Sequence, residues 1–272
     1  MGVGSAVAWF FCTWRDWHAR MLVRAGVSPN ALTIFGTVCT CLAGACMAVG
    51  AGSKFAWTLC PGDLRAYQSG AYMVLAAVFL FFCSAGDMLD GAVARIGKQS
   101  TKFGAFLDST LDRFSDFAIY LGIAFYFVLR GNVTYTLLPF LAVFWGQMIS
   151  YTRARAEDVI SNCTVGYWQR GERVAAVLIA TVSHNIPALL WQQALSPAFT
   201  VWARIHYTSQ VARGLTPQID PRQGPWYNRL RLWRYPRMTL AYDVLTGLNI
   251  AWLIFAPIPV KFDPLAKLLG LH

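Results

Sequence analysis

Long apolar runs alternate with short polar clusters along most of the 272-residue chain. A helix that crosses a bilayer needs about 20 largely apolar residues, and runs of that order recur here. We therefore predict six transmembrane helices, over residues 31–52, 70–85, 101–128, 134–151, 174–190 and 193–211. The second helix is expected to continue to about Gly97, and the fourth into the stretch TRARAE that follows Tyr151.

The two ends of the chain show different patterns. Residues 6–24 place Trp, Phe, Val and Met at helical spacing with arginines between them, which predicts an amphipathic helix at the membrane interface. Residues 238–259 are apolar except for Asp243 and form a possible seventh span. The expected fold is an all-α integral membrane protein with three parts: the interfacial helix (1–26), a membrane domain (27–213), and a basic loop with a C-terminal hydrophobic segment (214–272).

The composition supports a membrane location. Hydrophobic residues make up 56% of the chain and charged residues only 13%, whereas soluble domains carry about 25% charged residues. The net charge of +10 would also suit nucleic acid, but a chain this apolar would not stay in solution to bind it. We expect anionic lipid, and no nucleic acid, beside the basic clusters.

The distribution of Lys and Arg predicts the orientation. Most of them fall on the same side of the predicted spans as the N-terminal helix, including those at 95–102, 153–155 and 170–173. Positive loops face the cytoplasm. We therefore expect a multi-pass protein of the cell membrane, with the polar stretch between the second and third spans at the cytoplasmic edge.

Four aspartates in that stretch are the candidate chemical centre. Asp87 and Asp90 are three residues apart and Asp108 and Asp112 are four apart, so each pair shares one helix face. If the two helices fold back as a hairpin, the pairs face one cleft, where four carboxylates need cations between them. Hard oxygen ligands suit Mg²⁺, Mn²⁺ or Ca²⁺, and two such ions are typical of phosphoryl transfer.

Neighbouring residues bear on two other interpretations. The aspartates could simply pair with Arg95 or Arg113, or mark the path of a divalent-cation transporter, since acidic residues in membranes often line ion pathways. A transporter does not explain Gly91 and Gly104, which leave room for a ligand to approach the backbone beside an aspartate. Asp116 lies outside the pattern and is predicted to support the cluster or to pair with a basic residue.

The spacing Asp87-x2-Asp90-Gly91-x2-Ala94-Arg95-x8-Gly104-x3-Asp108-x3-Asp112 resembles, without a departure, the signature of the CDP-alcohol phosphotransferases. The resemblance covers about residues 5–213. It implies an enzyme that moves a phosphatidyl-type group from a CDP-linked lipid such as CDP-diacylglycerol to an alcohol and releases CMP. It also implies a homodimer.

The same resemblance assigns roles to the signature positions. Two Mg²⁺ ions, or Mn²⁺ in their place, would be held by Asp87, Asp90, Asp108 and Asp112, and Asp112 would also deprotonate the acceptor. The nucleotide site would be lined by Gly91, Ala94, Arg95 and Gly104. Pro29-Asn30-x2-Thr33 is similar to a short family motif that borders the cytidine, although the same residues also suit a plain helix cap.

The arginines after the fourth span bear on the acceptor. The stretch 150–157, SYTRARAE, resembles that of the phosphatidylinositol-phosphate synthases, and RGER at 170–173 resembles the element that opens their fifth span. Arg153, Arg155 and Arg173 would then hold a phosphorylated polyol by charge-assisted hydrogen bonds, unless they only anchor helix ends. Inositol phosphate is the expected acceptor, and glycerol phosphate or another alcohol is the alternative.

Overall fold

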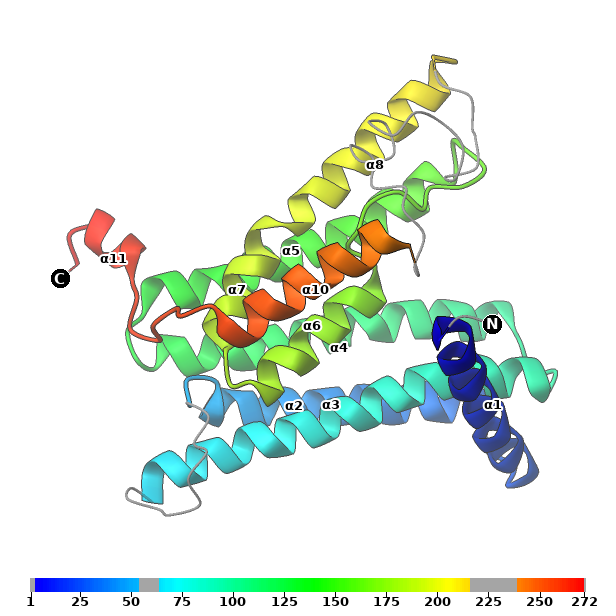
Figure 1. Cartoon of the computed structure of the whole chain (residues 1–272), viewed down its shortest axis with the longest axis horizontal. Coiled ribbons are helices and arrows are strands. Elements are labelled where there is room, and N and C mark those ends of the chain that lie inside the picture. The colour runs from blue at the N-terminus through cyan, green and yellow to red at the C-terminus, as the bar shows by residue number, and fades with distance from the viewer. Residues whose placement is uncertain (1–2, 54–63, 216–238, 272) are drawn as a thin grey trace.

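The computed structural model describes residues 3–53, 64–215 and 239–271, and within these ranges the chain forms helices and no strand. Figure 1 shows the long helices lying side by side, with the first helix set across them near the N-terminus and the last at the opposite end. The helices are α1 (Val3–Arg24), α2 (Pro29–Gly50), α3 (Leu64–Ile96), α4 (Lys102–Val128), α5 (Val133–Ala156), α6 (Arg170–Val182), α7 (Ile186–Leu195), α8 (Pro197–Ala212), α10 (Leu240–Phe255) and α11 (Pro264–Leu268).

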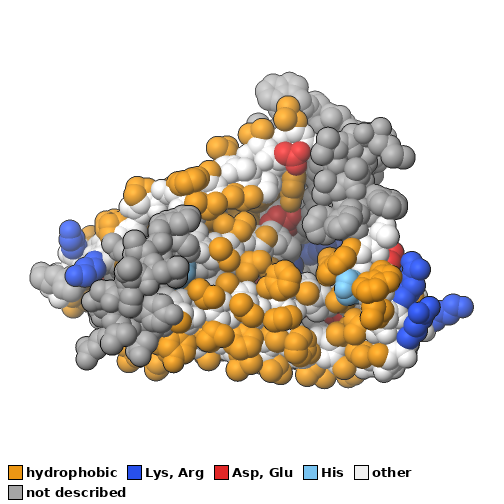
Figure 2. Space-filling model, turned by 60° about the horizontal axis from the view of Figure 1, so that its bottom comes forward, with side chains coloured by type: hydrophobic (Ala, Val, Ile, Leu, Met, Phe, Trp, Pro, Cys, Tyr) orange, Lys and Arg blue, Asp and Glu red, His pale blue; other side chains and the backbone are white. Residues whose placement is uncertain are grey.

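The predicted all-helical membrane fold is confirmed. In the part of the chain that the structure describes, three helices are long and apolar enough to cross a membrane: α2, α3 from Gly70 onward, and α5. Large hydrophobic side chains on α2 and α3 are exposed, among them Phe35, Val74 and Phe81. Figure 2 shows such side chains covering the middle of one face, with Lys and Arg mainly toward its two ends. An apolar face of this extent suits a lipid environment, while the count of six or seven spans stays a prediction.

The first four predicted spans correspond to α2, α3, α4 and α5, and polar caps explain where they begin. The side chain of Ser28 accepts a hydrogen bond from the N–H of Ala31, and Pro29 follows in the first turn of α2. Thr101 and Asn132 cap α4 and α5 in the same way. Between α3 and α4 the chain reverses through Lys98 at φ 53°. The predicted helical hairpin is therefore present.

The crossing of α2 and α4 is a backbone contact between two glycines. A Cβ added to Gly122 would collide with the carbonyl group of Gly44, and a Cβ added to Gly44 would collide with the carbonyl of Ala118. Small residues let membrane helices approach this closely. The contact lies within a core that includes Met47 and Ile123, and it fixes α4 against α2 beside the aspartates.

The predicted bounds of the fifth and sixth spans are wrong. The chain turns at residues 183–185, not between 190 and 193: α6 ends at Val182, and His184 adopts φ 54°. Asn185 caps α7, and Pro187 lies in its first turn, where a missing N–H costs nothing. The helix then changes direction at Ser196, which ends α7 and precedes Pro197 of α8. Both prolines mark helix starts and do not flank one turn.

The C-terminal segment packs onto the helices that precede it. Figure 1 shows α10 lying alongside α6. Near the start of α10, the hydroxyl of Tyr242 donates to Glu172, and near its end the carbonyl of Leu253 accepts from Ser183. The 16 residues of α10 rise about 24 Å, less than a full bilayer core. The basic loop predicted over 214–237 lies, from residue 216, outside the described residues.

Candidate functional site

The four aspartates lie on the facing ends of α3 and α4, and an arginine from a third helix joins them. Arg170, the first residue of α6, places Nη2 at 2.8 Å from Asp87 Oδ2 and 2.5 Å from Asp112 Oδ1. Arg113 Nη1 lies 3.8 Å from the other oxygen of Asp112. Asp112 itself is buried. One carboxylate from each helix of the hairpin thus shares a single guanidinium group.

Asp90 is held by neutral donors. The hydroxyl of Thr33 on α2 lies 3.0 Å from Asp90 Oδ2, and the backbone N–H of Gly91 donates to Oδ1 at 2.5 Å. Thr33 was predicted to border a nucleotide, and the structure places it directly against one of the predicted metal ligands.

A cavity of about 240 Å³ opens beside Asp90 and Asp108. Its lining includes all six residues that the sequence assigned to the nucleotide: Asn30, Thr33, Gly91, Ala94, Arg95 and Gly104. These residues come from α2, α3 and α4, so the fold brings together positions that are up to about 70 residues apart along the chain.

Gly104 keeps this cavity open. A Cβ at that position would lie 3.0 Å from Thr101 Oγ1 and 3.2 Å from Asn30 Oδ1, closer than side chains normally pack. At Gly91 a Cβ would come no nearer than 3.7 Å to Arg95 Nη1. Of the two glycines, Gly104 is the more tightly surrounded, because an added Cβ there would force Thr101 or Asn30 to shift.

Arg173, one turn after Arg170, forms a buried ion pair with Asp116. Its Nη2 lies 2.9 Å from Asp116 Oδ2, and a Cβ on Gly146 would lie 3.5 Å from its Nε. The prediction that Asp116 pairs with a basic residue is confirmed. Within the described part of the chain, Arg173 Nη1 and Arg170 Nε are buried and have no hydrogen-bond acceptor, so α6 offers two unused donors at the cluster.

Arg153 and Arg155 are placed differently. Arg153 Nε pairs with Glu157 at 2.9 Å, and Arg155 Nη1 pairs with Asp158 at 2.9 Å. Their side chains are 47% and 68% exposed, whereas that of Arg173 is 7% exposed. Of the three predicted acceptor arginines, the structure therefore places only Arg173 beside the cluster, through its ion pair with Asp116.

Arg170 is the residue that the sequence reasoning missed. It was recognised as part of a basic element but received no role, although it makes the shortest ion pairs with the predicted metal ligands. The spacing of Arg170 and Arg173, three residues apart in one helical turn, puts both on one face. That spacing was the available signal.

The donor set fits a hard divalent cation by its chemistry. Carboxylate oxygens are the preferred ligands of Mg²⁺ and Mn²⁺. Within the described ranges, no three His, Cys, Asp or Glu side chains converge closely enough to cage an ion as they stand. The Arg170 guanidinium between Asp87 and Asp112 shows nevertheless that the site holds a positive charge between its two helices, which is the requirement that a metal ion would meet.

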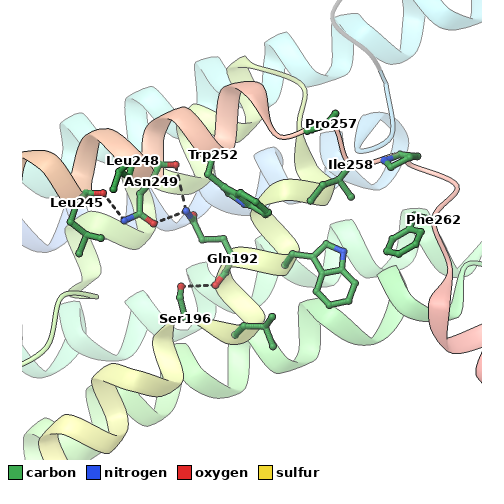
Figure 3. A pocket seen from close by; sticks show the side chains of 12 residues that line it. Gln192, Ser196, Leu245, Leu248, Asn249, Trp252, Pro257, Ile258 and Phe262 are labelled. Carbon is green, nitrogen blue, oxygen red and sulfur yellow. Dashed lines mark hydrogen bonds between the residues drawn. The ribbon is translucent and has the colours of Figure 1, made fainter. Parts of the chain in front are cut away.

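A larger groove of about 710 Å³ lies elsewhere, between α7, α10 and the segment that follows α10. Figure 3 shows its polar groups bonded to one another: Gln192 donates to Asn249 at 2.7 Å, and Ser196 donates to the carbonyl of Gln192. The rest of its lining is mainly apolar and includes no titratable side chain. The smaller cavity at the aspartates is the one equipped for chemistry.

Comparison with known proteins identifies the family of the chain. The family model described as CDP-alcohol phosphatidyltransferase matches residues 26–208. The phosphatidylinositol phosphate synthase of Mycobacteroides abscessus is 32% identical over 75% of this chain and 89% of its own. The archaetidylinositol phosphate synthase of Pyrococcus horikoshii is 32% identical over 69% of this chain and 86% of its own.

A solved relative supports the same assignment. The crystal structure of Mycobacterium tuberculosis phosphatidylinositol phosphate synthase with CDP-diacylglycerol bound superposes with a TM-score of 0.59 at 26% identity, covering 75% of this chain and 98% of that one. The same protein, solved with manganese and citrate, gives a TM-score of 0.57 at 28% identity, covering 75% and 93%. The matched family model spans more than half of the sequence and includes all four aspartates, so the chain belongs to the CDP-alcohol phosphatidyltransferase family.

Proposed function

We propose that this enzyme transfers a phosphatidyl group from CDP-diacylglycerol to inositol phosphate and releases CMP. The observation that carries the choice of a phosphorylated acceptor is the pair of buried donors, Arg170 Nε and Arg173 Nη1, which lack an acceptor among the described residues. An unpaired buried N–H is costly, and phosphate oxygens are strong acceptors for guanidinium groups. The relatives named as inositol phosphate synthases support inositol as the alcohol.

Membership in a phosphatidyltransferase family makes the chain an enzyme and removes the cation-transporter alternative. In the reaction proposed here, the acceptor hydroxyl oxygen forms a bond to the phosphorus that carries the diacylglycerol. The bond from that phosphorus to the CMP oxygen breaks, and CMP leaves. The hydroxyl proton needs a base at the reacting oxygen.

Asp112 is the proposed base. It is buried on α4, and its two carboxylate oxygens face guanidinium groups of Arg170 and Arg113. A carboxylate in this position can receive the acceptor proton while the acceptor phosphate lies against the α6 arginines. Proton removal and acceptor binding are thereby assigned to adjacent groups, which fixes the hydroxyl near the base.

Two Mg²⁺ ions, or Mn²⁺ in their place, are the proposed cofactors, held by Asp87, Asp90, Asp108 and Asp112. When bound, such ions clamp the pyrophosphate oxygens and offset the negative charge that develops there. The manganese complex of the mycobacterial relative supports a divalent ion at this family's site. The remaining ligand contacts fall to the cavity of about 240 Å³, where Arg95 and the small residues Gly91 and Gly104 suit a nucleotide phosphate and its sugar.

Arg153 and Arg155 remain proposed as outer contacts of the acceptor. Their pairs with Glu157 and Asp158 are exposed, and exposed pairs are weak enough to be exchanged for a phosphate. Substituting Arg155 with Ala tests the idea. A rise in the acceptor KM supports the contact, whereas unchanged kinetics assigns the arginine to the helix end alone.

The remaining proposals concern the surroundings of the site. The arginine-rich ends of α1 and α5 support a cytoplasmic location for the aspartates under the positive-inside rule. A homodimer is proposed from family resemblance. The division into parts 1–26, 27–213 and 214–272 also stays a proposal, and the packing of α10 on α6 favours treating its last part as continuous with the membrane domain.

A direct assay tests the proposed function. Purified protein in lipid nanodiscs receives CDP-diacylglycerol and Mg²⁺ with inositol phosphate, glycerol phosphate, inositol or serine, and CMP release is measured. We expect turnover with inositol phosphate at least about tenfold above that with inositol or serine, which lack a phosphate, as each charge-assisted hydrogen bond to phosphate contributes about 1.5–3 kcal/mol. Turnover with glycerol phosphate should also be lower, because the named relatives are inositol phosphate synthases. Preferred turnover of glycerol phosphate or of an unphosphorylated alcohol contradicts the assignment.

A further inference from the structure

The helix that carries the acceptor arginines has two chemically distinct faces. Arg170 and Arg173 contact aspartates of α3 and α4. Glu172 lies about 100° from Arg173 and about 160° from Arg170 around the helix, so it faces another way. On that side the hydroxyl of Tyr242, from α10, donates to Glu172 Oε1 at 2.7 Å.

Glu172 is a potential competitor for both arginines. It is buried, 9% exposed, and lies within one helical turn of each of them. A buried carboxylate attracts a nearby guanidinium group strongly. In the described ion pairs, however, Arg170 and Arg173 bind only aspartates. The hydrogen bond from Tyr242 keeps the Glu172 carboxylate on the α10 side.

The beginning of α6 depends on such contacts because it has little local support. The helix is 13 residues long, and its N-cap residue, Gln169, makes no side-chain capping bond. A second bond to α10 lies just before it: the hydroxyl of Tyr167 donates to Thr246 Oγ1 at 3.2 Å. Two residues one turn apart on α10, Tyr242 and Thr246, therefore hold the start of α6 and the residue before it.

We propose that Tyr242 is a positioning residue for the transfer reaction: through Glu172, it holds α6 in the rotation that turns Arg170 and Arg173 toward the aspartates. The inference rests on the proposed function in that these arginines bind the acceptor phosphate. Tyr242 lies beyond the residues matched by the family model, 26–208. The C-terminal segment is thus assigned a part in acceptor binding.

The test is Tyr242→Phe, which removes one hydroxyl and keeps the ring. We expect the acceptor KM to rise about threefold to tenfold, a change that corresponds to the net contribution of one typical hydrogen bond, with the KM for the CDP-lipid and the unfolding temperature nearly unchanged. Glu172→Gln retains an acceptor for Tyr242 and should stay near wild type. Glu172→Ala should match Tyr242→Phe, and the double variant should add nothing further.

Trp252→Phe is the matched control. Trp252 lies on the same helix, and its Nε1 donates to the carbonyl of Ala188 on α7 at 3.0 Å, away from the start of α6. It should lower the unfolding temperature without changing the ratio of the two KM values. Equal ratios for Tyr242→Phe and Trp252→Phe overturn the proposal, and so does a Tyr242→Phe protein that does not fold, because the hydroxyl would then serve the fold itself.

The acceptor used in this test is whichever one the wild-type enzyme turns over. If inositol phosphate is not a substrate, the proposed function fails, yet the comparison of Tyr242→Phe with Trp252→Phe proceeds with the true acceptor. If inositol phosphate is a substrate and the two variants behave alike, only the role of Tyr242 fails.

Discussion

Two buried carboxylates at opposite ends of the helices differ in their partners: Asp263, which supports the fold, and Asp112, the proposed base. Asp263, between α10 and α11, accepts four hydrogen bonds from neutral donors: Val133 N at 2.7 Å, Thr134 N at 3.1 Å, Thr134 Oγ1 at 2.6 Å and Ala266 N at 3.0 Å. Asp112 faces only guanidinium groups, those of Arg170 and Arg113. Asp263 is held by three backbone N–H groups and one hydroxyl, while Asp112 is balanced by two charged side chains.

The hydrogen bonds of Asp263 also affect the pKa of its carboxyl group. Burial alone would raise the pKa of Asp263, but the hydrogen bonds from Thr134, Ala266 and Val133 lower it below the ordinary value of 3.8. Its charge lies at the first turns of α5 and α11, where the helix dipole favours an anion. Fixed donors make Asp263 part of the fold. In the function proposed above, a substrate or a metal ion replaces the side-chain partners of Asp112.

The largest effect is expected from Asp112→Asn. The amide cannot act as a base and is a poor ligand for a hard cation, so turnover should fall at least about 10³-fold. An amide oxygen still accepts from Arg170, so the unfolding temperature should be retained. CMP release and thermal unfolding in detergent measure the two properties. Substantial activity in this variant would refute both roles of Asp112, and a large loss of stability would erase the contrast with Asp263.

The next effect is expected from Arg173→Lys. Lysine keeps the charge beside Asp116 but lacks the Nη1 group, which is the buried donor without an acceptor among the described residues. We expect the acceptor KM to rise about tenfold or more while the KM for CDP-diacylglycerol stays constant. Steady-state kinetics with each substrate varied in turn measures both. An equal rise in the two KM values would assign Arg173 to the fold, like Asp263.

Asp263→Ala should have the opposite profile. It removes the N-cap bond of α11 and the acceptor of two N–H groups in the first turn of α5. Each of these two contributions is worth about 0.5–2 kcal/mol, so the protein should lose roughly 1–4 kcal/mol while the folded fraction keeps its KM values. Because the folded-state pKa is lowered, this stabilisation is fully present above the ordinary pKa of 3.8 and is lost as pH falls through the folded value. The unfolding temperatures of wild type and variant should therefore converge in acid.

Asp243→Ala is the control for that comparison. Asp243 is an exposed carboxylate in the first turn of α10, so its loss should change the unfolding temperature only slightly. If Asp243→Ala loses as much stability as Asp263→Ala, then negative charge in the C-terminal segment stabilises the protein, and the hydrogen bonds of Asp263 to α5 and α11 do not.

Much of the aspartate end could be predicted from the sequence because its signals are local. The apolar runs, the cap at Thr101 and the spacing of the four aspartates lie within single helices or one hairpin. Helical periodicity converts such spacing into shared faces without knowledge of the rest of the fold. The cavity residues of α3 and α4 followed from the family signature in the same stretch, and Asn30 and Thr33 from the short motif that opens α2.

The errors and omissions arose where the signal is not local. The turn at 183–185 interrupts an apolar run and uses His184 at φ 54°, where a glycine would have marked it. The contact of Arg170 with Asp87 depends on the packing of α6 against α3. Asp263 caps a helix about 130 residues earlier in the chain. Tertiary packing creates these contacts, and no spacing in the sequence encodes them.

The smallest effect is expected from Thr33→Val, which probes an intermediate case. Asp90 accepts from one side-chain hydroxyl, that of Thr33, and from the N–H of Gly91, so it is partly fixed and partly available. Loss of the hydroxyl should raise the Mg²⁺ concentration for half-maximal activity about threefold to tenfold, as Asp90 is less well oriented, and leave turnover at saturating Mg²⁺ unchanged.

Thr37→Val provides the matched control, because Thr37 bonds only the carbonyl of Thr33 one turn away and contacts no aspartate in the described structure. Thr33→Ser should restore the Mg²⁺ dependence of the wild type. A changed dependence in Thr37→Val, or none in Thr33→Val, would show that Asp90 needs no fixed donor. Asp90 would then belong with the other aspartates of the cluster, and only Asp263 would depend on fixed hydrogen-bond donors.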